Sequence, residues 1–438
     1  MSLIYIAQGE TFHISFVKFA NKGCEQTFWY PDQGKKGSLK VRKEEVFMQG
    51  KRKKWPALLF FVILIVVPVL SILTPDKEKS FSERRTLAKR SVWSIQSFLD
   101  GSYGEQTENW LLDQFPGRDV FRMAKAEIET RFLGKSDADG YYKKDQAIYK
   151  TEDTLNEKNI RRAAEKMQQI KESYFAQTAC YYSVIPDKSY YLGEDEHPKL
   201  DEEKLLELMK EQLSAAEYLN LYDQLELDDY YRTDLHWKQE EITDVAEFLA
   251  GQMKKGKEGY SDEKISEMKS ESERKEADFP EEIKETDEAK LATDQFYGAY
   301  AKASALSVKP DEMYYIENAG IRDLQVYDYE KGEKVSVYAP QKLGGMDDYD
   351  FFLWGARALL TIKNPSVKRG DKLLVFRDSF GSSIAPLLAE SYEEVTLVDL
   401  RYVSVTQAMK QLEDKEYDTV LFLYSASILN HSDSMKFY

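Results

Sequence analysis

The chain has 438 residues, of which 42% are hydrophobic, so it can form packed cores and is not disordered throughout. Its formal net charge is −16, and an acidic surface repels phosphates, so we expect no nucleic-acid partner. The charge is unevenly distributed, because residues 1–54 carry 11 Lys/Arg and 5 Asp/Glu whereas the remainder is strongly acidic.

Residues 55–75, WPALLFFVILIVVPVLSILTP, separate the basic segment from the acidic one. Nothing between Ala57 and Leu73 is charged, and a run of roughly 17 to 20 apolar residues crosses a bilayer as a helix. The preceding KRKK at 51–54 puts the N-terminus in the cytoplasm and the later residues outside. We therefore predict a single-pass signal anchor in the cell membrane. A cleaved signal peptide and a buried core helix are the alternatives, and they fit the long lead-in and the KRKK less well.

Residues 1–54 are predicted to be a cytoplasmic N-terminal segment. Its first 47 residues have no sustained helical or strand period, and one hypothesis is that Met48 is the true start of the protein. Cys24 lies in this segment and Cys180 lies beyond the predicted anchor, so we expect no disulfide between them.

Beyond the anchor we predict a juxtamembrane linker at 76–100, which is charged and aperiodic, and one extracytoplasmic domain at 101–438. Two short helices are expected around the Pro-Gly break that follows Phe115. Apolar periodicity predicts further helices at 155–174 and 202–220, a strand at 178–186, and a helix beginning near Trp237. Charge dominates residues 253–290, which are interpreted as an exposed or partly disordered insertion, with a solvated helix face as the alternative.

The C-terminal third of the chain alternates between strand and helix patterns. Strands are predicted at 372–376, 394–400 and 418–425, and helices at 382–392 and 403–414. A β-α-β-α-β run with apolar strands is typical of a parallel sheet covered by helices on both faces. We therefore expect an α/β fold whose functional site lies at the carboxyl ends of the strands.

Ser379 is the first candidate for a chemical role. It lies in the loop RDSFGSS, 377–383, between a predicted strand and a predicted helix. Backbone N–H groups at the start of a helix can stabilise an oxyanion there, which is what a serine nucleophile requires. The alternative is that Ser379 only caps the helix.

His236 and Asp234 supply the groups that such a serine needs. A serine is a weak nucleophile at neutral pH, and it requires a base that a third group holds in the correct tautomer. The Asp-x-His spacing in YYRTDLHWKQE allows Asp234 to meet Nδ1 of His236, which leaves Nε2 free for Ser379. His236 could instead cap the following helix or pack beside Trp237. A metal site is a third reading, with His197 and His431 as the remaining histidines outside the N-terminal segment.

Several short motifs together resemble the DHHW protein family of bacterial cell-envelope proteins. They are YRTDLHW, DQFPGRD (113–119), SVIPDKSYY (183–191), KLGGMDDYDFFLWG (342–355) and RDSFGSS. That family is similar to the alginate acetylation proteins of the SGNH hydrolase-like superfamily. The resemblance spans about residues 75–431.

The resemblance implies an SGNH hydrolase-like parallel sheet flanked by helices, with a Ser-His-Asp triad carried onto Ser379, His236 and Asp234. The family's name describes Asp-His-His-Trp, whereas this chain has Leu235 in place of the first His. His236 therefore keeps the role of the base. Gly355 and Asn364 are our candidates for the oxyanion hole.

Three functions remain open at this point, and a metal-dependent hydrolase is the third of them. The first is a membrane-anchored extracytoplasmic esterase or O-acetyltransferase that modifies a cell-surface polysaccharide, with a polytopic membrane protein as acyl donor and no cofactor or metal. The second is a non-catalytic envelope protein that binds glycan or a partner protein with the same fold.

Overall fold

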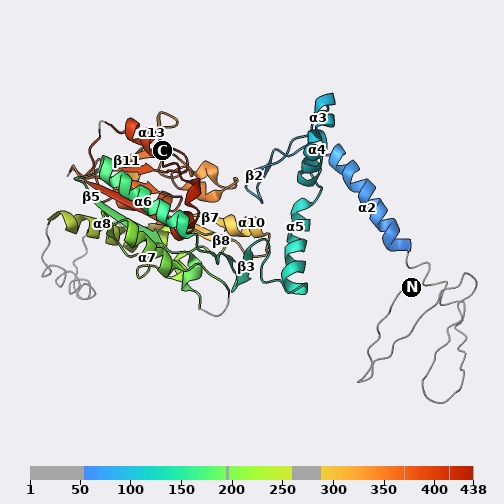
Figure 1. The fold of residues 1–438 in the computed structure, drawn as a ribbon, viewed down its shortest axis with the longest axis horizontal. Helices are drawn as coiled ribbons and strands as arrows, with labels where there is room; N and C mark the ends of the chain where they lie inside the picture. The colour runs from blue at the N-terminus through green and yellow to red at the C-terminus, as the bar shows by residue number, and fades with distance from the viewer. Residues whose placement is uncertain (1–53, 194–196, 259–287, 369, 414, 438) are drawn as a thin grey trace, which may run out of the picture.

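The computed structural model describes residues 54–193, 197–258, 288–368, 370–413 and 415–437. The start at Met48 and most of the predicted insertion lie outside the described residues. The described chain forms an apolar helix, a small helical unit beside it, and an α/β domain that contains the C-terminus (Figure 1).

The α/β domain is built on an eight-stranded sheet with the order β10-β9-β11-β13-β12-β14-β5-β6. The parallel strands are β13 (Glu394–Val398), β12 (Lys372–Arg377), β14 (Thr419–Ser425), β5 (Ala179–Ile185) and β6 (Glu217–Tyr218). The antiparallel strands are β11 (Leu359–Lys363), β9 (Gln325–Asp328) and β10 (Glu333–Val335). The mostly parallel α/β sheet predicted from the sequence is confirmed, while the three antiparallel strands at one edge were not predicted.

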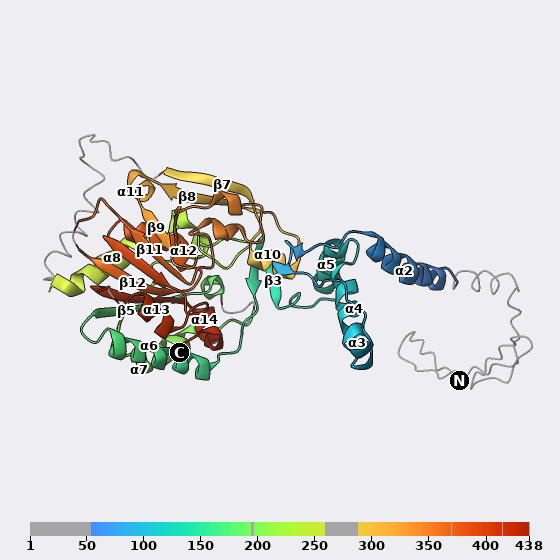
Figure 2. The ribbon, with the colours of Figure 1, turned by 90° about the horizontal axis from the view of Figure 1, so that it is seen from above.

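Helices cover both faces of the sheet and bury two apolar cores. One face carries α6 (Glu157–Tyr174), α7 (Glu202–Gln212), α13 (Val405–Gln411) and α14 (Ala426–Asn430). The other carries α8 (Thr243–Glu258), α11 (Ala319–Arg322) and α12 (Gly381–Ala389). Along β12, Leu374 and Phe376 enter the first core, whereas Leu373 and Val375 enter the second. Figure 2 shows α6 and α7 below the strands.

Two predicted helix boundaries differ from the structure. α7 ends at Gln212 instead of continuing to 220, because the chain turns back and adds β6 to the sheet beside β5. α8 begins at Thr243, so Trp237 precedes the helix and instead forms a bridge with Tyr230. Tertiary contacts override local apolar spacing at both places.

The N-terminal part comprises the apolar helix, a short hairpin and a helical unit. Its elements are α2 (Lys54–Leu73), β1 (Lys79–Ser80), β2 (Arg85–Thr86), α3 (Ile95–Leu99), α4 (Ser102–Asp113), α5 (Arg118–Glu127) and the π-helical turn η1 (Ile128–Phe132). Of the described residues, only α2 forms a helix long and apolar enough to cross a membrane. The expected Pro-Gly break separates α4 from α5, and Gly117 there has a φ of +73°, which favours glycine.

Two β-ribbons and a short helix connect the sheet to the N-terminal part. They are β3 (Tyr141–Lys144) with β4 (Ala147–Lys150), β7 (Glu288–Phe296) with β8 (Asp311–Glu317), and α10 (Ala299–Ser304). Both ribbon views place α10 and β3 between the sheet and α5 (Figures 1 and 2).

Candidate active site

The structure brings Ser379, His236 and Asp234 into one hydrogen-bonded chain. Nε2 of His236 lies 2.8 Å from Oγ of Ser379, and Nδ1 lies 2.6 Å from Oδ2 of Asp234. Because the carboxylate can only accept, Nδ1 carries the proton, and in the neutral imidazole Nε2 is then free to accept from the serine hydroxyl. This is the arrangement that activates a serine nucleophile.

Ser379 lies at the carboxyl end of β12, two residues beyond its last residue and just before α12. Its side chain is partly exposed, while the preceding Asp378 is fully buried. Asp378 fixes the loop, since its carboxylate accepts from the Phe380 N–H (3.0 Å) and from the Ser425 N–H (2.8 Å) and Oγ (2.7 Å). The loop therefore ties β12 to the end of β14 and presents Ser379 to solvent.

Aromatic side chains fix the ring plane of His236. Tyr349 stacks on the imidazole with centroids 3.8 Å apart and planes at 6°, and Phe380 contacts it at 4.7 Å. The Tyr349 hydroxyl and the Trp237 indole N–H lie 2.8 Å from Oγ of Ser383 in α12, so both rings are themselves anchored. His236 as a whole is 3% exposed, so solvent hardly reaches it.

Asp234 is held on its other side by α10. Its Oδ1 accepts from the N–H of Ala299 at 2.7 Å. Burial on its own raises the pKa of Asp234, but His236, Arg84 and the Ala299 N–H lower it well below its ordinary range. Asp234 is therefore ionised at neutral pH and can stabilise a protonated His236.

Lys188 holds the backbone of the loop that carries Asp234 and His236. Its buried Nζ donates to the carbonyl oxygens of Tyr231 (2.9 Å), Arg232 (3.1 Å) and Asp234 (2.7 Å). Burial lowers the pKa of Lys188 to about 8, and neighbouring carboxylates partly offset that effect. The side chain is thus an ammonium at neutral pH, with one N–H for each of the three carbonyls.

Asp311 fixes the same loop through the two residues before Asp234. Its carboxylate accepts from the Thr233 N–H at 2.8 Å and from the Thr233 hydroxyl at 2.7 Å. It also accepts from Nε of Arg232 at 2.9 Å. The backbone of the Asp-Leu-His motif is therefore tied down at several points.

A protein-family model matches part of the chain. Residues 221–398 match the model of the DHHW protein family. This DHHW region contains Asp234, His236, Tyr349 and Ser379, and the match confirms the resemblance expected from the sequence.

Solved structures share the fold of the chain. A DHHW family protein from Eubacterium siraeum aligns with a TM-score of 0.53 and 19% identity, covering 68% of this chain and 94% of that one. Bacillus cereus PatB1 aligns with a TM-score of 0.51 and 17% identity, covering 66% and 96%. Identities this low show the fold alone, which is the mostly parallel α/β sheet expected from the sequence. No curated protein matches the chain.

The two expected oxyanion donors, Gly355 and Asn364, both have N–H groups that are bonded elsewhere. The side-chain amide of Asn364 donates to the Ala389 carbonyl, at the far end of α12 and the opposite edge of the sheet. Gly355 lies on the loop before β11, but its N–H donates to the Phe352 carbonyl and is already used. Its φ of +81° and the closeness of Asp350 account for a glycine at that position.

The two histidines considered as further metal ligands have other contacts. His197 stacks on Tyr142 with centroids 3.7 Å apart, and Nε2 of His431 lies 2.9 Å from Oε1 of Glu152. Within the described part of the chain, no group of three or more His, Cys, Asp or Glu side chains is arranged to hold a metal ion.

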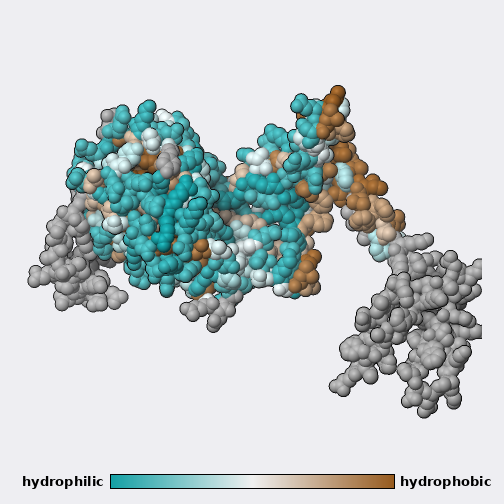
Figure 3. All heavy atoms as spheres, viewed as in Figure 1, coloured by the Kyte–Doolittle hydropathy of each residue, from teal (hydrophilic) through white to brown (hydrophobic). Residues whose placement is uncertain are grey.

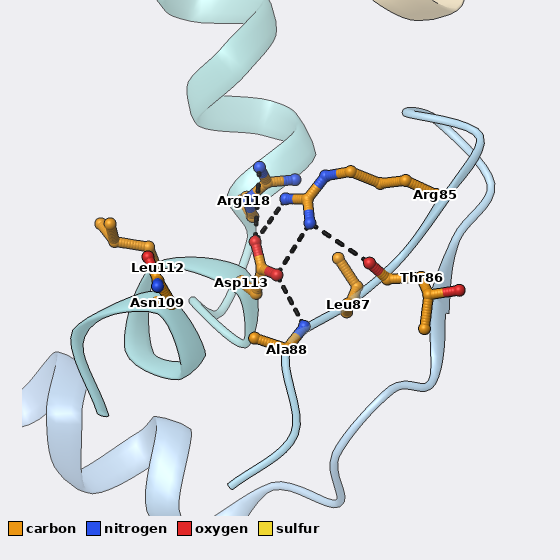
Figure 4. A pocket seen from close by; sticks show the side chains of 8 residues that line it. All are labelled: Arg85, Thr86, Leu87, Ala88, Asn109, Leu112, Asp113 and Arg118. Carbon is orange, nitrogen blue, oxygen red and sulfur yellow. Dashed lines mark hydrogen bonds and ion pairs between the residues drawn. The ribbon is translucent and has the colours of Figure 1, made fainter. Parts of the chain in front are cut away.

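A surface hollow lies beside the β1–β2 hairpin, and no residue of the candidate triad lines it. Figure 4 shows Arg85 and Arg118 directed at the carboxylate of Asp113, which also accepts from the Ala88 N–H at 2.7 Å. Its charged groups are paired with one another, so we assign it no role in the chemistry.

Three supporting residues of the candidate site were not identified from the sequence. Lys188 and Tyr349 lie inside motifs that carried the family resemblance, SVIPDKSYY and KLGGMDDYDFF, but nothing in either motif points to His236. Ala299 acts through its backbone N–H, which leaves no signal in the side-chain pattern. The motifs together thus indicated the family resemblance, whereas the role of each residue could be assigned only from the fold.

Proposed function

We propose that this protein is an extracytoplasmic, membrane-anchored serine esterase or O-acetyltransferase that modifies a cell-surface polysaccharide. The observation that carries the proposal is the chain from Ser379 Oγ through His236 to Asp234, with links of 2.8 and 2.6 Å. A non-catalytic protein has no need of a buried, correctly tautomerised base aimed at a partly exposed serine.

The chemistry follows from the roles of the three residues. His236 takes the proton of Ser379 as Oγ bonds to the carbonyl carbon of an acyl ester, and the bond from that carbon to the alcohol oxygen breaks. The proton passes from His236 to the departing alcohol, which leaves an acyl-serine. A sugar hydroxyl or water then attacks the acyl carbon while His236 takes its proton. The bond from that carbon to Oγ of Ser379 breaks, and His236 returns the proton to Oγ, which regenerates the free serine. The backbone N–H of Ser379, at the start of α12, is our candidate oxyanion donor.

The polysaccharide acceptor and a polytopic membrane protein as acyl donor are proposed from the family resemblance. PatB1 and the Eubacterium siraeum protein support the fold on which that assignment rests. A transferase differs from an esterase in excluding water from the acyl-enzyme, so the choice of acceptor depends on what covers Ser379 when the glycan is bound.

The proposed membrane anchor is supported by α2 and by the helices next to it. Figure 3 shows apolar residues along α2 and on the neighbouring helical unit, in contrast to the polar α/β domain. The exposed apolar residues of that unit include Val92, Trp93, Ile95, Phe98, Leu99, Leu112, Val120, Phe121, Met123, Ile128, Phe132 and Leu133. Such a surface is costly in water and favourable against lipid. The KRKK before α2 supports a cytoplasmic N-terminus.

Hydrolysis of p-nitrophenyl acetate by the full chain tests the proposed function. We expect turnover by the wild type and a loss of about 10³-fold or more in Ser379→Ala and His236→Ala. Ser391→Ala, two residues beyond the last residue of α12, is the matched control and should keep full activity. A folded wild type without turnover would favour the glycan-binding alternative.

A further inference from the structure

The turn between β1 and β2 lies just after the apolar helix and directs two consecutive charged side chains to different partners. Arg84 forms an ion pair with Asp347, and the carboxylate of Glu83 lies 3.2 Å from Nε of Arg122. Arg84 has a φ of +55°, a left-handed conformation that is unfavourable for a residue with a side chain. A non-glycine residue keeps such a conformation where surrounding contacts hold it there.

The Arg84 branch leads to the ring of His236. Asp347 caps the short helix η6 (Asp348–Phe351), and its Oδ1 accepts from the Tyr349 N–H at 3.2 Å. Tyr349 is the residue whose ring stacks on His236. Arg84 therefore fixes the charged cap of the element that sets the plane of the imidazole.

The Glu83 branch leads to the carboxylate of Asp234. Glu83 also pairs with Arg118, 2.8 Å away, so the hairpin is joined to α5 by two arginines. Arg122 then donates to the Ala303 carbonyl at 2.8 Å, in the last turn of α10. The other end of α10 supplies the Ala299 N–H to Asp234.

The two branches thus reach different groups of the Asp234–His236 pair. One ends on the ring face of the imidazole, and the other ends on the carboxylate oxygen that the imidazole does not use. The positive charge of Arg84 is also close enough to Asp234 to lower the pKa of that carboxyl, after the opposing effect of burial and the larger effect of His236.

We propose that Glu83 and Arg84 are positioning residues for the candidate triad. The site is then competent only when the β1–β2 hairpin is in contact with α5 and η6. This inference deepens the proposed function and rests on it. It connects the segment that follows the apolar helix to the geometry of the base. An acyl-accepting site built in this way is assembled at a fixed place relative to that helix.

The first test is the rate of fluorophosphonate labelling of the full chain. We expect Arg84→Ala and Arg122→Ala each to slow labelling by about 10- to 100-fold, because small displacements of catalytic groups have effects of that size. Arg84→Lys, which keeps the charge, should restore part of the rate. Arg90→Ala is the matched control, since Arg90 contacts Asp76 and Trp110 in the same segment and reaches neither branch. Combining Arg84→Ala with Asp347→Ala should add little to the single change.

A second readout does not depend on activity. The chain has four histidines, so the Nδ1–H proton of His236 in ¹⁵N-histidine-labelled full chain is assigned by comparison with His236→Gln. We expect this resonance to shift or broaden in Arg84→Ala and to stay unchanged in Arg90→Ala. An unchanged resonance together with wild-type labelling would overturn the positioning role. If folded wild type is not labelled at all, the proposed function fails, and the resonance alone decides the positioning role.

Discussion

Gly298 and Asp234 are in such close contact that a Cβ built on the glycine would lie 2.2 Å from the Cβ of the aspartate. The φ of Gly298 is −75°, so the requirement is for space and not for a left-handed backbone. Gly298 caps α10, and this closeness lets the next N–H reach Oδ1 of Asp234. The glycine therefore permits the hydrogen bond that fixes the candidate orienting group.

Gly298→Ala is predicted to displace α10 from Asp234. We expect the free energy of unfolding to fall by about 1–3 kcal/mol, as in other overpacked sites, and esterase activity to fall by about 10-fold or more. Gly251→Ala, on α8, is the control, because a Cβ there meets nothing within 4 Å and alanine favours the helix. Equal stability and activity in the two variants would show that the Gly298 contact does not constrain the site.

Lys188→Met is predicted to remove the cation that binds three loop carbonyls while keeping the length of the side chain. Buried carbonyls that lose their donor destabilise the fold, so we expect a loss of about 2–4 kcal/mol in urea unfolding and little remaining esterase activity. Lys204→Met is the control, since Lys204 pairs with Glu207 on the exposed side of α7. A wild-type unfolding midpoint for Lys188→Met would contradict this account of the loop.

Glu202 is predicted to make stability depend on pH. Burial raises its pKa to about 8, partly offset by the hydrogen bond from the Tyr222 hydroxyl at 2.6 Å. At a pH between the unfolded pKa of 4.5 and the folded pKa, Glu202 keeps its proton in the folded chain and loses it in the unfolded chain. The stabilisation is therefore complete below the unfolded pKa and is lost as the pH rises through about 8.

Glu202→Gln keeps the neutral form at every pH. We expect its free energy of unfolding, relative to the wild type, to rise by about 3 kcal/mol between pH 5 and 8, measured by urea denaturation. Parallel pH profiles for the two proteins would mean that Glu202 is already ionised in the fold.

The apolar surface of α3–α5 is predicted to contact lipid. With Cys24 and Cys180 replaced by alanine, an environment-sensitive fluorophore at Phe98→Cys should shift to the blue in vesicles and be quenched by spin-labelled lipid. The same probe at Glu108→Cys, on the exposed polar side of α4, should do neither. If neither position is quenched, this surface faces water or another protein.

The parts that could be predicted from the sequence are those with a local signal. β12, β13 and β14 are mostly apolar because both faces of a central parallel strand are buried. β10, at the edge of the sheet, and its neighbour β9 are short and partly exposed, so their patterns do not stand out from the surrounding loop.

The residues of the candidate site also fall into those with a local signal in the sequence and those without one. Ser379 follows a clear strand, and Asp234 and His236 lie two residues apart, so each could be proposed from its neighbours. Lys188 and Gly298 lie far away in the sequence and are joined to the site only by the fold. The expectation for Asn364 shows the limit, because residue type alone does not say at which edge of the sheet a side chain lies.

The measurement that tests the central claim most directly is the intact mass of the full chain after reaction with a fluorophosphonate, followed by peptide mapping. The account predicts one adduct, located on Ser379, which is absent from Ser379→Ala and forms far more slowly in His236→Ala and Asp234→Ala. A folded wild-type chain that gains no mass, or an adduct on another residue that persists in Ser379→Ala, would contradict it.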